Sequence, residues 1–526
     1  TLQKLADIKA NQVIHLSYNQ GSKSKKINIA LPADQNIFLE EDTLININYN
    51  HHSYNSPEFN SQPSLPYRLS GKGPALATGD LDNNGLEDLY VGGDLNNPGN
   101  LFFQKADGTF HKVVLNETKG REVLKALIFD ANGDGIQDLY LACGGVNYPK
   151  GHNNYQDLLY LGTGGFDLSL SENILPEFKT SSACVAAGDI DGDGDLDLFI
   201  GGYSEPKNFP APPRSYLLRN DNNKFIDVTE ELAPELLRPG MVRDAVWTDY
   251  NKDGKNDLVI AGEWMPVMLF ENTNGTLKNK TESLGLENTG WWQSVIVGDF
   301  DNDGYIDLIA GNMGQNSGYK ASPEMPVQLY ATDLNNDGSF DPVMTYFIKG
   351  KETNNASREV LLSRNPVLQK RFPSHHSFAK ANIEDLISKA ELSNAYKVES
   401  RNFNSVFLRN RQNNFFQSET LPVSAQLFPV RVILQQEIND KTIFLLGGGF
   451  ENAAPNGSSF GISGVLPLIY DKKTNKIVHD HPIVPLHGDV HDMKFLSLKG
   501  GDKLLIIGIS NNKMKIYKIK FSNKIQ

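Results

Sequence analysis

The stretch DIDGDGDLDLFIGG, from Asp189 to Gly202, decides the fold because it joins a dense acidic segment to an apolar one. Five aspartates fall within nine residues, and the chain then turns apolar and ends on two glycines. Like charges at this spacing repel one another strongly unless a cation lies between them. The short apolar run that follows is typical of a strand buried on both faces. The pattern therefore predicts a cation-binding loop that leads into a core strand.

The acidic segment occurs six times along the chain. The other five copies begin at Asp80, Asp130, Asp249, Asp299 and Asp333. The first five copies start 50 to 60 residues apart, and the sixth follows the fifth after only 34 residues. Blades of β-propellers repeat at roughly 40 to 50 residues plus their loops. The spacing therefore favours a radial repeat of β-sheets, with the sixth copy outside the regular series.

A second periodic feature predicts the number of repeats. Short apolar runs that end in glycine, such as DLYVGG, follow the first five acidic segments. Two further runs, IFLLGGG (443–449) and LLIIG (504–508), end the same way without an acidic segment before them. Four short strands per repeat is the composition of a propeller blade. The sequence thus predicts an all-β fold: a seven-bladed β-propeller with calcium-binding hairpin loops, a small N-terminal β fragment and one helical insertion.

The predicted propeller spans residues 43–526. The segment NIEDLISKAELSNAY (382–396) is predicted to be helical and to lie within an insertion of about 350–400. The run PVMTYFIKG, which follows the sixth acidic segment, is expected to form an outer hairpin or part of an insertion. The last repeat has no outer strand of its own, so we expect the N-terminal segment TLININY (43–49) to complete it and close the ring. Closure would remove an exposed sheet edge.

The acidic segments follow the pattern D-x-[DN]-x-[DN]-G-x-x-D, with oxygen side chains at positions 1, 3, 5 and 9. Position 7 can add a backbone carbonyl. Ca²⁺ takes six to eight oxygen ligands at roughly 2.3 to 2.6 Å, and the glycine at position 6 lets the chain turn around the ion. An EF-hand would need a glutamate at position 12, where this chain has apolar residues, and a helix instead of a strand afterwards. The pattern predicts five or six structural Ca²⁺ ions, the alternative being acidic turns exposed to solvent.

The predicted metal ligands are the residues at positions 1, 3, 5, 7 and 9 of the six segments: Asp80, Asp82, Asn84, Leu86, Asp88, Asp130, Asn132, Asp134, Ile136, Asp138, Asp189, Asp191, Asp193, Asp195, Asp197, Asp249, Asn251, Asp253, Lys255, Asp257, Asp299, Asp301, Asp303, Tyr305, Asp307, Asp333, Asn335, Asp337, Ser339 and Asp341. Six bound Ca²⁺ ions would bring the formal net charge of −13 close to zero. Most of the negative charge of the chain is therefore expected to belong to side chains that bind metal ions.

Composition narrows the class of protein further. The chain has 526 residues, of which 39% are hydrophobic, so a sizeable core is expected. Its negative charge argues against a general nucleic-acid-binding protein, and no run approaches the 18 apolar residues of a membrane-spanning helix. The chain has only two cysteines, Cys143 and Cys184, which are too few for a disulfide framework. Both are expected to be small buried side chains. The first residues lack the features of a signal peptide, so we expect an upstream region to precede this chain.

Several segments resemble a known family. The acidic hairpins with glycine-ended strands look like the FG-GAP/VCBS repeats of integrin-α-type propellers. The stretches GPALATGDLDNNGLEDLYVGG, PGMVRDAVWTD and GWWQSVIVGDFDNDG are similar to the cartilage-acidic-protein-like (ASPIC/UnbV-associated) family of Bacteroidota. The resemblance covers nearly the whole chain. It predicts that residues 1–42, with LADIKANQVIHLSYNQG, are the C-terminal part of an ASPIC/UnbV-like domain plus a linker. The last two predicted blades lack acidic segments, so no metal ligand is expected there.

The same resemblance implies a location and a set of partners. Members of such a family are exported to the cell surface or outer membrane, often as lipoproteins, which predicts a lipid anchor in a region outside this chain. They occur near SusC/SusD-type nutrient transporters. The resemblance therefore implies protein subunits of an outer-membrane uptake complex, a glycan or both as partners, and it does not supply a settled activity.

The loops opposite the acidic segments form the predicted partner-binding surface. Arginine and aromatic side chains are common energetic anchors of binding surfaces, and long loops on a rigid scaffold often carry function. The residues expected there are Arg68, Arg121, Arg214, Arg243, Trp264, Trp291, Trp292 and Arg431, accompanied by Tyr148 and Tyr203. The alternative for each of them is a structural role, as a buried tryptophan or as an arginine paired with a neighbouring carboxylate.

Catalysis has less support in the sequence. The stretch HDHPIVPLHGDVHD (479–492) holds four histidines and three aspartates that could bind a transition metal, but its spacing matches no recognised ligand pattern. The main hypothesis is a non-enzymatic, calcium-stabilised propeller that binds a protein or glycan. One alternative is a carbohydrate-active enzyme, a lyase or glycoside hydrolase, because paired catalytic carboxylates cannot be recognised by spacing alone. A structural role within a larger assembly is the third possibility.

Overall fold

The computed structural model describes residues 37–41, 45–53, 56–364, 366–438, 441–450, 462–472, 474–479 and 483–521. Within these residues the strands form eight antiparallel sheets, and the helices are few and short. The prediction of an all-β fold is confirmed. None of the described helices has the length and apolar character needed to cross a membrane.

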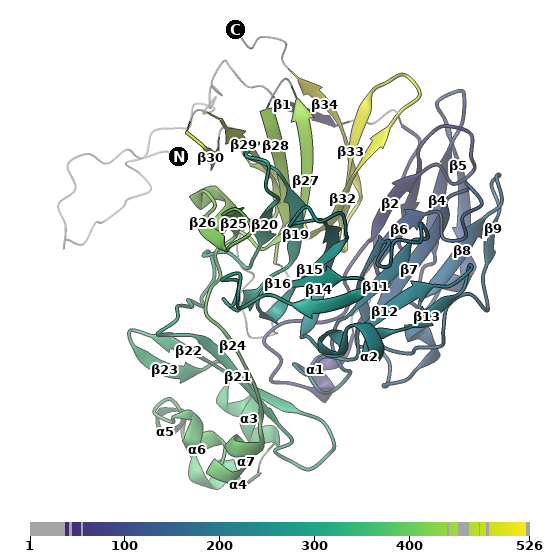
Figure 1. Cartoon of the computed structure of the whole chain (residues 1–526). Coiled ribbons are helices and arrows are strands. Elements are labelled where there is room, and N and C mark those ends of the chain that lie inside the picture. The colour runs from purple at the N-terminus through teal and green to yellow at the C-terminus, as the bar shows by residue number, and fades with distance from the viewer. Residues whose placement is uncertain are drawn as a thin grey trace, which may run out of the picture.

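Seven of the eight sheets share one plan, in which the first strand lies innermost and the later strands follow outward (Figure 1). In chain order, their strands are β2 (Leu76–Gly79), β3 (Asp88–Val91), β4 (Gly99–Gln104) and β5 (Phe110–Leu115); β6 (Glu122–Phe129), β7 (Asp138–Gly144), β8 (Leu158–Gly162) and β9 (Leu168–Leu170); β10 (Ser182–Gly188), β11 (Asp197–Gly202), β12 (Tyr216–Asn220) and β13 (Phe225–Asp227); β14 (Met241–Thr248), β15 (Asp257–Met265), β16 (Met268–Thr273) and β17 (Thr276–Asn279), with β18 (Gly290–Trp291) beside β15; β19 (Ser294–Gly298), β20 (Asp307–Gly311), β25 (Val406–Asn410) and β26 (Phe416–Thr420); β27 (Val430–Ile438), β28 (Lys441–Gly448), β29 (Gly464–Asp471) and β30 (Lys476–Val478), with β31 (Val484–Pro485) beside β29; and β32 (Val490–Ser497), β33 (Lys503–Ile509), β34 (Lys515–Phe521) and β1 (Ile37–Glu41).

The first strands of these sheets contact one another in a closed order. Strand β2 contacts β6, β6 contacts β10, β10 contacts β14, β14 contacts β19, β19 contacts β27, β27 contacts β32, and β32 returns to β2. Sheets arranged radially around a common axis in this way form a β-propeller. The glycine-ended apolar runs of the sequence form the second strand of each sheet, and they are buried along their length in β3, β7, β11, β15 and β20.

The N-terminal strand closes the ring, although it is not the segment that the sequence predicted. Strand β1 pairs with β34 over five residues, from Ile37 opposite Phe521 to Glu41 opposite Tyr517. The predicted strand 43–49 is wrong in its described part, because residues 45–49 belong to no strand. Ile47 and Tyr49 are buried between the first and last sheets, so their alternation arises from packing against those sheets and not from a strand ladder. Residues 1–36, where the ASPIC/UnbV-like segment was predicted, lie outside the described residues.

A separate hydrophobic cluster fills each interface between neighbouring sheets. One cluster joins the second sheet to the third, another joins the third to the fourth, and the series continues around the ring. Cys143 and Cys184 are free thiols buried in two of these clusters, as predicted. Because each sheet buries both faces, every sheet depends on two neighbours, and loss of one contact surface is expected to weaken the whole ring.

The glycines that end the second strands are required by this packing. A Cβ on Gly201 would lie 2.6 Å from the Sγ atom of Cys184 and 2.7 Å from Val242 on the next inner strand. A Cβ on Gly311 would lie 2.4 Å from the backbone carbonyl of Val430, again on the next inner strand. Atoms cannot approach this closely, so only glycine permits the observed spacing between adjacent sheets.

The eighth sheet belongs to an insertion between β20 and β25. Its strand order is β23–β22–β21–β24, with β21 (Val327–Thr332), β22 (Asp341–Ile348), β23 (Lys351–Asn354) and β24 (Tyr396–Ser400). Its helices are α3 (Arg358–Arg364), α4 (Pro366–Arg371), α5 (His375–Phe378), α6 (Ile383–Leu386) and α7 (Lys389–Asn394). The insertion projects at the lower left of Figure 1. It therefore begins earlier than the predicted 350–400, and the predicted helical segment 382–396 forms α6, α7 and the start of β24.

Two more helices cover the propeller itself, α1 (Glu58–Ser61) and α2 (Thr229–Leu232). The chain around α1, a loop near Tyr203 and the inserted sheet share one hydrophobic cluster. Tyr67, Trp264 and Trp291 form its aromatic centre, with ring centroids 5.3 Å apart for Tyr67 and Trp291 and 4.8 Å apart for the two tryptophans. This cluster, which we call the aromatic plug, packs the inserted sheet against the ring.

One buried carboxyl group gives the fold a testable pH dependence. Asp157 accepts hydrogen bonds from the Cys143 N–H and the Tyr140 hydroxyl, both at 2.7 Å, and its burial raises its pKa from 3.8 to about 7. Between these two values the folded state keeps a proton that the unfolded state has lost, so stability falls as the pH rises. Between pH 5 and pH 8 the free energy of unfolding of the wild type is expected to fall by about 2 to 3 kcal/mol more than that of the Asp157→Asn variant. Guanidinium unfolding at both pH values, at constant Ca²⁺, measures this loss.

Asp167→Asn is the matched control, because Asp167 is an exposed aspartate after the same strand β8. This variant should keep the wild-type dependence of stability on pH. An equal dependence in Asp157→Asn and wild type would show that the buried carboxyl group does not titrate in this range.

Candidate functional site

The acidic loops are the candidate metal sites. Five of them join the first strand of a sheet to its second, and the sixth joins β21 to β22 in the insertion. In all six loops the aspartate at position 1 accepts a hydrogen bond from the N–H of the glycine at position 6, at 2.7 to 3.1 Å. Those six glycines all have positive φ, between 81° and 97°, a conformation that favours glycine. The sequence pattern therefore folds into one repeated loop geometry.

A second hydrogen bond is shared by all six loops. The side-chain oxygen at position 5 accepts from the N–H at position 7, at 2.8 to 3.0 Å, for example from Ile136 to Asp134. These local bonds hold the side-chain oxygens at positions 1 and 5, a carboxylate in every case except the amide of Asn84, on the inner side of the turn. At position 7 it is the backbone N–H that makes this bond, whereas the sequence analysis predicted the backbone carbonyl of the same residue as a metal ligand.

The aspartate at position 9 has a further structural role. Asp197 is 1% exposed, and its two oxygens accept from the N–H groups of Ile190 at 2.8 Å and Asn220 at 2.7 Å. Since Ile190 lies in the loop and Asn220 ends β12, this carboxylate ties the loop to the third strand. Equivalent bonds to the third strand are made by Asp88, Asp138, Asp257 and Asp307. Sequence analysis predicted these aspartates only as ligands.

Carboxylate oxygens converge in three of the loops. One oxygen from each of three aspartates lies within 4.8 Å of the others in the groups Asp80, Asp82 and Asp88; Asp189, Asp191 and Asp197; and Asp299, Asp301 and Asp303. In the described part of the chain, these are the groups of three or more His, Cys, Asp or Glu side chains that are arranged to share an ion. An all-oxygen, acidic donor set suits a hard divalent cation such as Ca²⁺ better than the softer ions Zn²⁺ and Cu²⁺.

The pKa values of these carboxyl groups reflect their crowding. Burial raises the pKa of Asp82 and Asp191, and the neighbouring carboxylates Asp80 and Asp193 raise it further. At position 9, burial first and then nearby loop carboxylates raise the pKa of Asp88 and that of its equivalents to about 6 or 7. A bound cation would counteract both causes by favouring the ionised form.

An arginine side chain contacts the fifth acidic loop. The guanidinium of Arg409, on β25, contacts Asp301 and also hydrogen-bonds Glu419 at 3.1 Å and the backbone of Asn475 at 2.9 Å. Arg409 is 2% exposed and lies far from this loop in the sequence, so no local signal could have predicted the pair. The positive charge of Arg409 partly neutralises this loop, so it is expected to bind Ca²⁺ more weakly than the loop at Asp80.

The residues of the predicted partner-binding surface do not come together on one exposed face. Trp264 and Trp291 are buried in the aromatic plug, and Trp292 is buried between the fourth and fifth sheets. A partner therefore meets none of these rings at the surface. Tyr203 is also buried, and Tyr148 stacks on His152 with centroids 4.3 Å apart.

The arginines of that predicted surface make internal contacts. Arg121 donates to the carbonyls of Asn153 and Gln156, and Arg214 pairs with Asp227 at 2.7 Å and Glu230 at 2.8 Å. Arg68 lies 3.7 Å from Glu58. Arg243 and Arg431 instead face the central channel of the ring. For most of these residues the structural alternative considered in the sequence analysis describes their contacts.

Two stretches with catalytic potential, 479–492 and 457–461, lie partly or wholly outside the described residues. Residues 480–482 of the histidine-rich stretch 479–492 lie outside the described residues, and its other histidines join no metal-ligand group. The stretch GSSFG (457–461), which the sequence analysis did not single out, has the G-x-S-x-G spacing of a nucleophile elbow and also lies outside the described residues. An elbow serine precedes a helix, whereas the next described element here is the strand β29.

The fold and the repeated loops together define a class, the β-propellers built from acidic hairpin repeats. The FG-GAP-like repeat model matches residues 80–141, 130–200 and 249–310, which together make up less than half of the chain. Each match runs from one acidic loop into the second strand of the following sheet.

One curated relative and several solved structures are similar to this chain. Cartilage acidic protein 1 of Xenopus tropicalis is 25% identical over 279 residues, which cover 46% of this chain and 39% of that protein. The match thus spans well under half of the length of this relative. Solved structures with a similar course include BBS1N in complex with ARL6DN (10% identity, 88% of this chain and 95% of that chain, TM-score 0.38) and the V. cholerae biofilm matrix protein Bap1 (10% identity, 91% of each chain, TM-score 0.33).

Proposed function

We propose that this chain is a calcium-stabilised, cell-surface β-propeller that binds a partner protein and serves a larger outer-membrane assembly. The FG-GAP repeat propeller fold indicates a protein-binding extracellular domain. The observation that carries the calcium part is the common geometry of the six acidic loops, which turn their carboxylates inward through the same two hydrogen bonds. A SusC/SusD-type transporter is the proposed assembly, and a glycan is the proposed alternative ligand.

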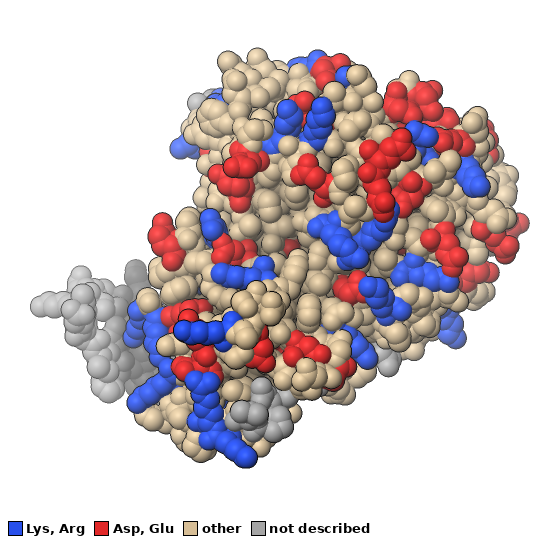
Figure 2. Space-filling model, turned by 60° about the horizontal axis from the view of Figure 1, so that its bottom comes forward, with Lys and Arg blue, Asp and Glu red and all other residues tan. Residues whose placement is uncertain are grey.

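The insertion is the proposed partner-binding surface. The whole insertion (312–405) has eleven Lys and Arg residues against ten Asp and Glu, and its excess of basic residues lies between residues 346 and 401, with ten against six, in a chain whose formal net charge is −13. Figure 2 shows basic side chains gathered over the lower left of the molecule, where Figure 1 places the insertion. The insertion has its own hydrophobic core, which keeps this basic surface in place. An acidic protein surface would complement it electrostatically.

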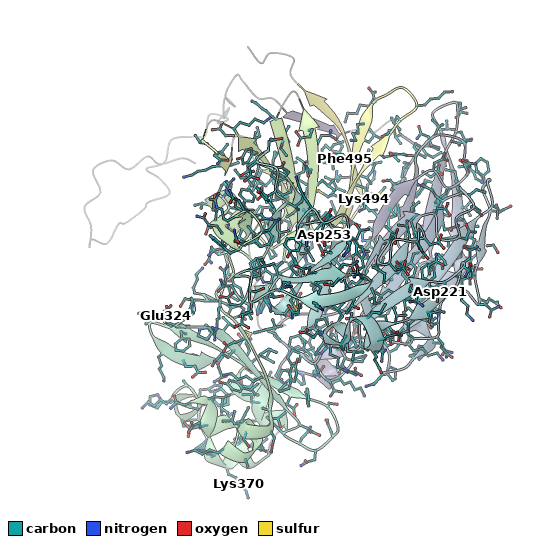
Figure 3. The ribbon with its side chains drawn as sticks, viewed as in Figure 1. Asp221, Asp253, Glu324, Lys370, Lys494 and Phe495 are labelled. Atoms are coloured by element: carbon teal, nitrogen blue, oxygen red, sulfur yellow. The ribbon has the colours of Figure 1, made fainter. Side chains whose placement is uncertain are left out.

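Charge reversal in the insertion tests this proposal. Lys370, Lys380 and Lys389 are exposed, and Lys370 lies at the far end of the insertion (Figure 3). Replacing all three with Glu is expected to weaken capture of outer-membrane proteins from detergent extract at least tenfold, because each reversal turns attraction into repulsion. Quantitative mass spectrometry of proteins bound to the immobilised chain, with Ca²⁺ present, measures the capture.

Lys119, Lys224 and Lys278 provide the control, since all three are exposed on the propeller and outside the insertion. The corresponding triple Glu variant should capture the same proteins as wild type. Equal capture by all three forms would exclude the insertion as the binding surface. New reducing ends or unsaturated products from a polysaccharide panel would instead support the carbohydrate-active alternative.

A further inference from the structure

Irregularities in the inner strands direct a set of side chains into the central channel. Strands β6, β10, β14, β27 and β32 each contain a register shift near their start, at which one residue is left out of the pairing with the second strand. Such bulges turn a side chain away from its regular direction and are frequent beside functional sites. The residues left out are Leu124, Ala183, Arg243, Arg431 and His491. All five line one cavity, which we call the channel cavity.

The channel cavity has a volume of about 210 Å³ and is lined by residues from six of the seven inner strands or the turns before them. On β14 the lining runs from Arg243 to Val246, and on β32 it runs from His491 to Lys494. At the usual rise of a strand, each of these segments extends about 10 Å along the propeller axis. The side chains of Lys125 and Lys494 are 29% and 27% exposed, so this end of the cavity reaches solvent. The cavity therefore has room and access for a small molecule.

The charges that line the cavity are mainly positive. Four cationic side chains, Lys125, Arg243, Arg431 and Lys494, line it together with two carboxylates, Asp244 and Asp492. Figure 3 places Lys494 among the inner strands near the middle of the ring.

Both carboxylates already have hydrogen-bond donors. Asp244 accepts from the Lys125 ammonium group at 3.2 Å and from the Val295 N–H at 3.1 Å. Asp492 accepts from the N–H groups of Leu76 at 2.9 Å and Met493 at 2.8 Å. Neither carboxylate depends on the arginines for a partner.

Arg243, in contrast, lacks hydrogen-bond acceptors. Its side chain is 8% exposed, yet it makes no hydrogen bond with the described residues, and its Nε atom is buried without a partner. The nearest carboxylate oxygen, on Glu263, is 3.7 Å away. The two oxygens of Glu263 already accept from the Tyr67 hydroxyl and the Gln293 amide. The guanidinium also lies over the Tyr203 ring, 4.9 Å from its centroid, so the unmet hydrogen bond is that of the buried Nε, and an anion in the cavity would supply an acceptor that the described residues do not.

Arg431 and His491 also have hydrogen-bonding groups that could contact a ligand in the cavity. The Arg431 side chain is 6% exposed, and it donates from Nε to the Gly449 carbonyl at 3.1 Å, while a terminal nitrogen is 3.6 Å from Asp489. The Nδ1 atom of His491 is buried and has no hydrogen-bond partner among the residues that the structure describes. The unmet hydrogen bonds of the cavity are thus concentrated on the residues that the bulges direct inward.

We propose that the channel cavity binds a small carboxylate, held by the guanidinium groups of Arg243 and Arg431. Guanidinium groups match the two oxygens of a carboxylate with two parallel hydrogen bonds. Glu263 and Asp489, close behind the two arginines, offset part of their charge and so favour a singly charged carboxylate over phosphate. The carboxylate could belong to a free organic acid or to an acidic sugar.

Isothermal titration calorimetry of the full chain in 2 mM CaCl₂ tests the proposal. The probes are sodium acetate, sodium glucuronate and sodium phosphate, with glucose as the neutral counterpart of glucuronate and ionic strength held constant. Saturable binding of one acetate or glucuronate per chain is expected, and glucose should not bind. Binding of both carboxylates indicates a free organic acid, and binding of glucuronate alone indicates an acidic sugar.

The variants assign the binding to the cavity. Arg243→Gln and Arg431→Gln are each expected to weaken carboxylate binding at least tenfold. Arg243→Lys keeps the charge in case Arg243→Gln does not fold, and it should weaken binding because a lysine cannot make the paired contact. Arg411→Gln is the control, because Arg411 is 39% exposed, donates to Gln417 on the outer strand β26 and does not line the cavity. No saturable binding of either carboxylate, binding of phosphate alone, or equal binding by all variants would overturn the proposal.

Discussion

Removal of divalent cations with EGTA is expected to lower the midpoint of thermal unfolding by on the order of 10 °C. A site filled at a hundred times its dissociation constant contributes about 2.7 kcal/mol, and five or six such loops are proposed here. Without an ion, the carboxylates crowded into each loop repel one another. Burial first, and then neighbouring carboxylates, raise the pKa of Asp82 and Asp191. Differential scanning calorimetry with EGTA, and again after excess CaCl₂ is returned, measures the shift.

Metal analysis gives the same test a second readout. Dialysed protein should retain Ca²⁺ at several ions per chain, and Mg²⁺ should restore the midpoint less well, because Mg²⁺ requires a small, regular octahedron of ligands. A midpoint that moves by less than about 2 °C with EGTA, together with no bound Ca²⁺, would show that the loops are acidic turns exposed to solvent.

Asp197→Ala is expected to destabilise the protein by about 2 to 5 kcal/mol even when Ca²⁺ is absent. The reason is that the Asp197 carboxylate satisfies two buried backbone N–H groups, those of Ile190 and Asn220, and alanine leaves both without acceptors. Guanidinium unfolding in EGTA isolates this contribution from metal binding. In Ca²⁺ the loss should be larger, because the same carboxylate is also a proposed ligand.

Asp195→Ala is the matched control, since Asp195 is an aspartate of the same loop whose backbone N–H, and not its side chain, bonds within the turn. It should change stability by less than about 0.5 kcal/mol in EGTA. Equal effects of the two variants would mean that the loop carboxylates act only through their total charge.

Much of the fold could be predicted from sequence because the repeat is visible in it. The acidic loops and the glycine-ended strands follow from local patterns that recur, so an error in assigning one copy is corrected by the others. The N-terminal outer strand has no second copy, and only its existence was predicted. The closing strand was placed at 43–49 in place of β1 because both segments have apolar residues suited to a strand. Only the ladder with β34 distinguishes them.

The candidate sites were predictable only where they are local. Every oxygen at positions 1, 3 and 5 lies within one turn, so spacing was enough to propose it. The contact between Arg409 and Asp301 joins distant parts of the chain, and no spacing reveals it. The same holds for Arg243 and Arg431, which looked like surface anchors and instead reach the channel cavity through bulges. A bulge is set by the packing of two strands, which neither strand encodes alone.

The pairing of β1 with β34 has a mechanical consequence. Ile37, at the start of β1, lies opposite Phe521, at the end of β34, so tension applied between these two points would load the ladder at its last pair. Bonds loaded in this way open one after another, like a zipper, and yield at lower force than bonds that share the load in shear. The ring would thus open at its seam under stretching while the other sheets stay folded, and the seam could reclose when the tension ends.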